Sequence, residues 1–304
     1  MIEYFVYGYI LKSNKEFHML TPYKGEKNQG EIQTRIFIDD NWNRDFNNQS
    51  ISVDYKENVV ILRIGRMVEY QISHTDNQIF VYSTDFAWVE STFLNLPFAL
   101  LFSQKNMLLL HASSLVIGKK IVPLCAPKGT GKTTVSMGLS RFYSFYSDDT
   151  LLLKMENENI LAYYGTKHVK LTKDSYDFLI ADDCFERLNK NLQGKAYVEV
   201  NENIETDLGQ IENLFFLQRK GNDVSVKKIF DKFTRKILLH SNICGTGTLG
   251  YEYCKIIEKL DLFQFLLNHL DFFKITVRDD KTQLETTLLE IKQVIDDSVK
   301  SISQ

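Results

Sequence analysis

The sequence is poor in the residues and runs that mark specialised classes of protein. Its 304 residues include only fifteen glycines and four prolines, so a collagen-like, low-complexity or disordered chain is not expected. The longest apolar stretches, such as Phe93–Phe102 and Met107–Ile117, fall short of the roughly 20 residues that a membrane-spanning helix needs. Apolar residues make up 44% of the chain and charged residues 25%, which is typical of a folded protein of one large domain or two ordinary ones.

Charge of one sign is not in excess either. Lys and Arg number 36 and Asp and Glu 39, a formal net charge of -3, so neither a nucleic acid nor a membrane is expected as a partner. The segment Met1–Phe5 lacks the basic region and the small-residue cleavage site of a secretory signal. A cytoplasmic location is therefore the default expectation.

The cysteines are few and scattered. Cys125, Cys184, Cys244 and Cys254 form no CxxC pair and have no clustered histidines near them. Neither a zinc site nor a disulfide framework is indicated, and we expect buried structural thiols.

The first 90 residues favour strands. Short β-branched or aromatic runs, separated by Asn, Asp and Gly turns, predict a meander of strands at Arg35–Ile38, Ile51–Tyr55, Val59–Ile64, Met67–Ile72 and Gln78–Tyr82. Trp88–Ser103 then has apolar residues at near-helical spacing, and Pro97 should lie at a helix start or a kink. We predict a β-rich N-terminal region over residues 1–90.

The next segment predicts a hairpin, a loop, a helix and a strand. Strands at Leu115–Ile117 and Ile121–Cys125 flank a glycine-containing turn, and Pro123 requires a bulge or an unpaired position because it has no N–H. A helix over Lys132–Arg141 and a strand over Phe142–Tyr146 follow.

Beyond residue 149, strands and helices alternate. We predict strands at Leu151–Met155, Ala196–Val200, Leu214–Gln218 and Phe272–Val277, and helices at Lys173–Ile180, Phe230–Ile243, Tyr251–Leu270 and Thr282–Val299. The fold class is α/β with a mixed sheet (α+β), and residues 91–304 form the second predicted domain, which binds a nucleotide.

One segment satisfies the phosphate-loop pattern. The candidate nucleotide-binding residues are Ala126, which stands where the first glycine usually does, Pro127, Lys128, Gly129, Thr130, Gly131, Lys132, Thr133 and Thr134. The glycines let the backbone turn its N–H groups toward a polyphosphate, and the following helix adds its positive N-terminal end. Lys132 should reach the β- and γ-phosphates, and the Thr133 hydroxyl should bind magnesium. ATP is favoured over GTP because no NKxD motif is present.

Two further candidates surround this loop in the sequence. Asp148 and Asp149 close the strand after the loop's helix, where carboxylates could face the metal and the γ-phosphate. Adjacent strand residues point to opposite faces, so we expect only one of the two to project directly into the site. His111, before the hairpin, would on its own be interpreted as a core or turn histidine.

The order of these motifs resembles a known family. The sequence Leu110-His111-Ala112-Ser113, a hairpin, the phosphate loop, a helix, a strand and Ser147-Asp148-Asp149 resembles the catalytic core of the bacterial HPr kinase/phosphorylase family. Its relatives include kinase-like proteins of peptide-modification pathways and enzymes that phosphorylate free serine. The resemblance implies a phosphoenolpyruvate carboxykinase-like phosphate-loop core.

The resemblance also implies roles for single residues. Lys132 is then the phosphate lysine, Asp149 the base that takes the proton of the acceptor hydroxyl, and His111 the active-site histidine. Magnesium would be held by Thr133 together with Asp148 and Asp149, with Asp148 either orienting the water shell of the metal or serving a structural role. ATP and Mg²⁺ are the implied cofactors.

The chain also departs from the family. A Glu-x-Arg-Gly-x-Gly segment, whose glutamate helps to hold magnesium in the bifunctional enzymes, is absent, so phosphorylase activity is not expected. Glu199 could replace that glutamate, and Lys195 and Arg219 could contact phosphate, although ordinary strand residues are the simpler interpretation. Gly245–Gly250 spells GxGxxG, but no strand precedes it, so we predict a loop between helices.

The sequence therefore predicts a Mg-ATP-dependent kinase that transfers the γ-phosphoryl group to a hydroxyl, most simply of serine, in a peptide, a protein or a small molecule. The alternative is an ATP-gated binding or regulatory module without phosphate transfer. A decarboxylating carboxykinase is weaker, because no second metal-binding histidine and lysine set is found. The related enzymes assemble, so a homo-oligomer is an open expectation.

Overall fold

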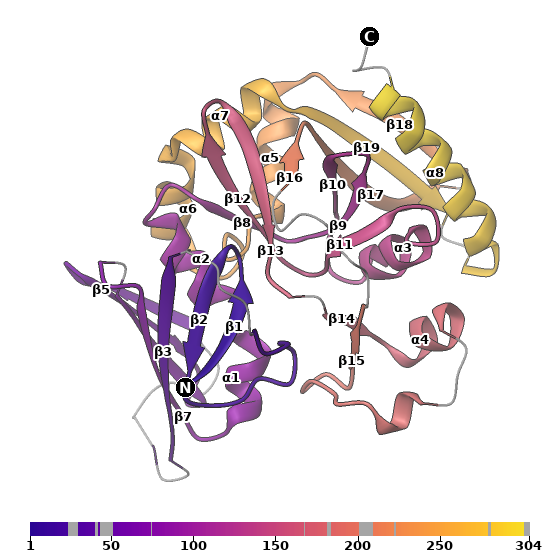
Figure 1. Ribbon diagram of the computed structural model, residues 1–304. Helices are drawn as coiled ribbons and strands as arrows, with labels where there is room; N and C mark the ends of the chain where they lie inside the picture. Colours follow the sequence, from indigo (N-terminus) through magenta and orange to yellow (C-terminus); the bar gives the residue numbers. More distant parts are fainter. Residues whose placement is uncertain are drawn as a thin grey trace.

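The computed structural model describes residues 1–23, 30–39, 42, 51–73, 75–166, 168–180, 184–200, 209–221, 223–278 and 281–300. Two mixed β-sheets with helices packed on them form the fold (Figure 1). The predicted mixed α/β class is thus confirmed. The finer prediction of a carboxykinase-like core, and the division of the chain near residue 90, stay predictions.

The first sheet holds the N-terminal strands. Its order within the described residues is β1-β2-β3-β7-β6-β5-β4. The bounds are β1 (Ile2–Val6), β2 (Tyr9–Ser13), β3 (Glu31–Ile38), β4 (Ile51–Tyr55), β5 (Val59–Ile64), β6 (Val68–Ser73) and β7 (Gln78–Ser83). The predicted meander holds for β4 to β7 only, because β3 pairs in parallel with both β2 and β7.

A tight hairpin joins β1 and β2, and the sequence pattern did not predict it. Tyr7 and Gly8 both have positive φ angles, 52° and 78°, as a two-residue type I′ turn requires. Tyrosine is not a usual residue there, so no turn signal was visible. Tyr7 is nevertheless fully buried, and its hydroxyl donates to the Leu94 carbonyl at 2.7 Å and contacts Thr150 Oγ1 at 2.6 Å. These bonds tie the turn to the part of the chain that carries the predicted aspartates.

The second sheet carries the predicted phosphate-loop segment. Its order is β18-β19-β17-β10-β16-β13-β12-β8, and β9 pairs with β10 and β11. The bounds are β8 (Leu108–Leu110), β9 (Ala112–Ile117), β10 (Lys120–Cys125), β11 (Ser144–Ser147), β12 (Leu151–Glu156), β13 (Asn159–Tyr164), β16 (Gly209–Ile211), β17 (Asn213–Gly221), β18 (Ser225–Ile229) and β19 (Asp271–Arg278). A separate pair consists of β14 (His168–Leu171) and β15 (Ala196–Glu199).

The β9–β10 hairpin lies where it was predicted. Its turn contains Gly118 at φ 64°, and Pro123 lies opposite Ser114 on the β9 side. On the other side, β10 pairs with β16 at Lys120 and with β17 from Leu124 onward. Pro123 lies between these two ladders, which is the unpaired position that its missing N–H demands.

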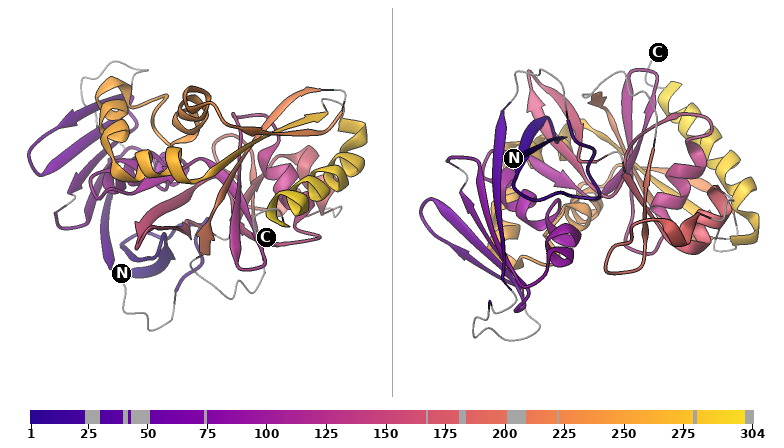
Figure 2. Two further views of the ribbon diagram at one scale, coloured as in Figure 1. Left: turned by 90° about the horizontal axis from the view of Figure 1, so that it is seen from above. Right: turned by 60° about the horizontal axis from the view of Figure 1, so that its bottom comes forward.

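Helices cover both faces of the second sheet. They are α1 (Phe86–Thr92), α2 (Leu96–Ser103), α3 (Lys132–Leu139), α4 (Lys173–Leu179), α5 (Lys232–Asn242), α6 (Gly250–Lys259), α7 (Asp261–His269) and α8 (Leu284–Lys300), with short 3₁₀ turns at Phe185–Arg187 and Lys281–Gln283. In Figure 2 the first sheet and α8 lie at opposite ends of the molecule.

Two predicted helices are each divided. The Trp88–Ser103 segment forms α1 and α2, with Pro97 in the first turn of α2, where it needs no N–H partner. The predicted helix Tyr251–Leu270 breaks at Leu260, whose extended backbone (ψ 134°) ends α6 and begins α7. No described helix is by itself long and apolar enough to span a bilayer. The α1–α2 pair passes that test only together, with a bend of 51°.

Two hydrophobic cores hold these layers together. One joins the first sheet, α1 and α2 to one face of the second sheet and to α5, α6 and α7. The other lies on the opposite face, between the sheet, α3, α8 and the β14–β15 pair. The first core runs across residue 90, so the N-terminal strands pack directly on the part of the chain that follows.

Replacing Tyr7 with Phe should lower the free energy of unfolding by about 1–3 kcal/mol, because the buried Leu94 carbonyl and Thr150 hydroxyl lose a partner. Urea denaturation followed by circular dichroism measures the change. Tyr163→Phe is the control, since Tyr163 is only partly buried and its hydroxyl makes no hydrogen bond within the described residues. Equal losses in both variants would contradict this account.

Candidate functional site

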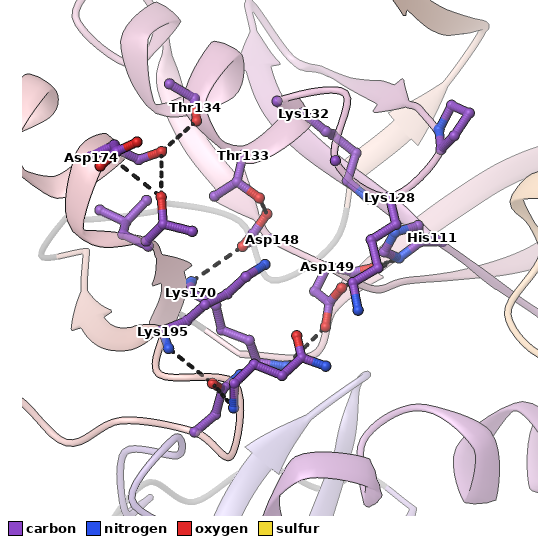
Figure 3. A pocket seen from close by; sticks show the side chains of 18 of the residues that line it. His111, Lys128, Lys132, Thr133, Thr134, Asp148, Asp149, Lys170, Asp174 and Lys195 are labelled. Carbon is purple, nitrogen blue, oxygen red and sulfur yellow. Dashed lines mark hydrogen bonds and ion pairs between the residues drawn. The ribbon is translucent and has the colours of Figure 1, made fainter.

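The predicted site residues lie around one cavity of about 1110 Å³ (Figure 3). From the sequence prediction the lining includes His111, Pro127, Lys128, Gly129, Gly131, Lys132, Thr133, Thr134, Asp148 and Asp149. Ala126, which is buried, and Thr130 belong to the loop but do not line the cavity. Residues from 111 to 149 are therefore brought together as the motif order suggested.

The phosphate-loop segment connects β10 to α3. Gly129 and Gly131 have φ angles of 86° and 90°, in the left-handed region that favours glycine. Arg219, on the neighbouring strand β17, donates from Nε to the Thr130 carbonyl at 2.7 Å. A Cβ atom on Gly131 would lie 3.0 Å from Arg219 Nη2, so the loop and this guanidinium are closely fitted.

Lys132 is the first residue of α3 and is only 7% exposed. Its ammonium nitrogen makes no hydrogen bond within the described residues, although it is buried at the wall of the cavity. A buried charge without a partner is costly, and the adjacent helix N-terminus adds further positive potential. The residues present therefore fit a bound polyphosphate, whose oxygens would supply the missing partners.

Asp148 is a structural junction. Its Oδ1 atom accepts hydrogen bonds from the Thr133 hydroxyl, at 2.9 Å, and from the Ser113 hydroxyl, and its Oδ2 atom accepts from the Lys170 backbone N–H at 3.3 Å. The side chain is almost fully buried. Carboxylate and hydroxyl oxygens are ligands that Mg²⁺ accepts, so Thr133 and Asp148 fit a magnesium ion that also binds phosphate oxygens. The described residues contain no cluster of three or more His, Cys, Asp or Glu side chains that could hold a metal ion.

Asp149 follows the end of β11 and has a φ angle of 68°. Its Oδ2 atom is 2.9 Å from Lys170 Nζ, and its Oδ1 atom is 3.3 Å from His111 Nδ1. Burial would by itself raise the pKa of this carboxyl, but the charges of Lys170, His111 and Lys132 hold the pKa well below its usual range. Asp149 is therefore ionised at neutral pH.

The expectation that only one aspartate projects into the site is wrong. Both Asp148 and Asp149 line the cavity. Strand alternation does not apply to them, because β11 ends at Ser147 and the left-handed backbone of Asp149 turns its side chain back toward the same space.

His111 lies between β8 and β9, and its backbone N–H donates to the Asn242 carbonyl at 2.6 Å. Its Nδ1 atom is 2.9 Å from the Asp149 carbonyl oxygen and close to Oδ1 of the same residue. Both neighbours are acceptors, which assigns the proton to Nδ1 and leaves Nε2 with its lone pair. Burial and the Lys132 charge lower the pKa of His111 despite the opposing effect of Asp149.

Several lining residues were not predicted. Lys170 of β14 contacts both aspartates, α1 and the turn after it add Trp88, Ser91, Thr92 and Asn95, and the α4 end adds Thr172, Asp174 and Ser175. Alternation in His168-Val169-Lys170-Leu171 sets Lys170 opposite its buried neighbours, but nothing in the sequence links that face to Asp149. Packing between distant segments creates the link.

The weaker sequence candidates differ in whether they line the cavity. Lys195 and Arg219 line the cavity, whereas Glu199 is exposed and accepts a hydrogen bond from the Thr21 hydroxyl at 2.9 Å, away from the lining. The GxGxxG segment forms the predicted loop, between α5 and α6.

The cysteine prediction holds in part. No disulfide joins two of these cysteines within the described residues, and Cys125 and Cys244 are buried. Cys184 is exposed and Cys254 half-buried, so the expectation of buried thiols is wrong for these two.

Comparison with known proteins gives a distant structural similarity. No protein-family model matches the chain, and no curated protein matches it. Among solved structures the chain is similar to the HPr(Ser) kinase/phosphatase from Coxiella burnetii, with 14% identity and a TM-score of 0.34 over 64% of this chain and 99% of that one. The fold is that of a mixed α/β protein in which the predicted phosphate-loop segment connects a strand to a helix.

In metal-free, nucleotide-free protein, NMR titration of the His111 ring should give a pKa below about 6.5. Lys132→Met should raise this pKa, since a nearby cation is removed, and Asp149→Asn should lower it further. Because the folded-state pKa is lowered, stability from this group decreases as the pH falls from about 6.5 toward the folded value. A His111 pKa that falls or stays constant in Lys132→Met would refute the electrostatic account.

Proposed function

We propose that the protein is a cytoplasmic, magnesium- and ATP-dependent kinase that transfers the γ-phosphoryl group to a hydroxyl, most simply that of serine, in a peptide, a protein or a small molecule. One observation carries the proposal. The buried ammonium of Lys132 has no partner within the described residues, and it shares a cavity with the ionised carboxylate of Asp149. The first group suits the phosphates of a nucleotide, and the second suits an acceptor hydroxyl.

The donor half consists of the loop and its neighbours. Backbone N–H groups of the glycine turns, the Lys132 ammonium and the N-terminus of α3 would bind the phosphates, and Arg219 keeps the loop in place through the Thr130 carbonyl. Thr133 and Asp148 would hold magnesium, which when bound neutralises charge on the phosphate oxygens.

The acceptor half centres on Asp149. Its carboxylate can accept the hydrogen bond of a hydroxyl and orient the oxygen toward the γ-phosphorus. A bond then forms between that oxygen and phosphorus, the bond from phosphorus to the β,γ-bridging oxygen breaks, and the hydroxyl proton passes to Asp149 as ADP leaves. Because such transition states are loose, positioning by the carboxylate contributes more than early removal of the proton.

The cavity is large enough for both substrates. Sites for one drug-sized ligand usually enclose about 300–1,000 Å³. The cavity exceeds this range, at about 1110 Å³, and extends from the phosphate loop to α1 and to the loop with Asn191 and Lys195. A nucleotide bound at α3 leaves the α1 side for the acceptor.

A second candidate function is an ATP-gated binding or regulatory module that transfers no phosphate. It is favoured by the fact that both carboxylate oxygens of Asp149 already have neighbours, Lys170 and His111. Transfer of radiolabelled γ-phosphate to free serine and to serine peptides separates the two functions. Label found only as inorganic phosphate would favour the module or a plain ATPase.

Asp149→Asn should leave MgATP binding within about 3-fold of wild type while phosphate transfer falls by about 100-fold or more, because the neutral amide loses the ion pair with Lys170 that positions this side chain and cannot take the proton. Calorimetry measures the binding and the radiolabel assay measures the transfer. Asp177→Asn, at a surface ion pair with Lys173, is the matched control and should change neither quantity. Undiminished transfer in Asp149→Asn would disprove the assignment of the base.

Lys132→Met should weaken MgATP binding by about 10- to 100-fold, because the ion pair with the phosphates is lost. The same change removes an unpartnered buried charge, so the ligand-free protein should melt at a higher temperature than wild type. Thermal unfolding with and without MgATP tests both effects, with Lys119→Met in the exposed hairpin turn as the control. Retained MgATP stabilisation in Lys132→Met would place the nucleotide elsewhere.

A further inference from the structure

Lys170 is a charged residue of this cavity that neither the phosphate-loop pattern nor the family resemblance assigns. It lies in the middle of β14, whose other residues alternate in burial, with Val169 and Leu171 packed in the second core. This alternation turns the Lys170 side chain to the opposite face, where it lines the cavity. The short strand β14 therefore places the Lys170 side chain in the site.

Lys170 contacts both aspartates at once. Its backbone N–H donates to Asp148 Oδ2 at 3.3 Å, and its ammonium donates to Asp149 Oδ2 at 2.9 Å (Figure 3). The side chains of Lys170 and Asp149 are 20% and 30% exposed, so this ion pair is largely sheltered from water. Sheltered pairs of this kind are screened less by salt than exposed ones.

The other charged and titratable groups around Asp149 cannot do the same task. They come from several elements and include Tyr7, His111, Lys132, Asp148, Tyr197 and Cys244. In the proposed reaction Lys132 binds the phosphates. The Nδ1–H group of His111 donates its shorter hydrogen bond, at 2.9 Å, to the Asp149 carbonyl. Lys170 remains as the cation for the carboxylate.

We infer that Lys170 is a positioning residue: it holds Asp149 Oδ2 so that Oδ1 faces the acceptor hydroxyl. The inference rests on the proposed function and deepens it, because it names the oxygen that meets the acceptor. Oδ1 has only the longer contact with His111, at 3.3 Å, and so keeps the capacity to accept a hydrogen bond.

The segment between β2 and β3 holds this lysine in place indirectly. The β14–β15 pair is anchored by the Thr166 hydroxyl, which donates to the Met19 carbonyl at 2.6 Å, and by the Thr21 hydroxyl, which donates to Glu199. Both contacts join residues before 25 to the pair that carries Lys170. The acceptor half of the site therefore depends on the N-terminal region for its geometry.

The test compares Lys170→Met and Lys170→Gln with Lys170→Arg, which keeps the charge and can pair with a carboxylate. We expect both neutral variants to lower kcat for phosphate transfer by about 10- to 100-fold, the size of effect seen when an orienting partner is lost. The KM and Kd for MgATP should stay within about 3-fold of wild type, and Lys170→Arg should recover most of the loss. Lys228→Met is the matched control, since it removes a similar pair with Asp271 away from the cavity.

A double variant separates positioning from a structural role. If Lys170 acts through Asp149, Asp149→Asn combined with Lys170→Met should be no slower than Asp149→Asn alone. Multiplied losses, an unchanged kcat in both neutral variants, or a loss of MgATP binding that accounts for the lower activity would each overturn the inference. A wild-type protein that transfers no phosphate to any acceptor would instead disprove the proposed function.

Discussion

The unpaired ammonium of Lys132 is the constraint on which the site depends. The chain buries this cation at the start of α3, where the helix N-terminus adds to the positive potential and no described group accepts a hydrogen bond from it. The free-energy cost of burying this charge must be offset by packing elsewhere, including the burial of Val135 and Leu139 on the same helix. An anion that entered the cavity would remove the cost, and in the proposed function this relief is a source of the affinity for phosphate.

The predictable part of the site is local in the sequence. Gly129 and Gly131 need left-handed backbone angles, and the helix after them follows from its own pattern, so a short window contains all the information. The positions of the aspartates after β11 likewise follow from their distance from the loop along the chain, through α3 and β11. Residues whose neighbours lie close in the chain could be assigned before any coordinates were known.

The remainder depends on packing between distant segments. Lys170 reaches Asp149 only because β14 crosses the end of β11, and Trp88 lines the cavity only because α1 packs across from the phosphate loop. The β1–β2 hairpin was missed for a related reason, since Tyr7 tolerates its strained turn through a hydroxyl bonded to Leu94 and Thr150. The periodicity of apolar residues contains no information on such distant partners. It also does not indicate the break at Leu260, where one continuous apolar pattern spans two helices.

The two adjacent aspartates differ in how readily their side chains can change hydrogen-bond partners, and this difference suits the separate roles that they have in the proposed reaction. Asp148 is held by Thr133, by Ser113 and by a backbone N–H, so any movement would leave buried donors unpaired. Asp149 is more exposed, and its neighbours are the partly exposed ammonium of Lys170 and a histidine that also has the main-chain carbonyl as an acceptor. Asp149, unlike Asp148, can change a hydrogen-bond partner without leaving a buried donor unpaired, and the carboxylate that accepts and later releases a proton in the proposed reaction needs this freedom.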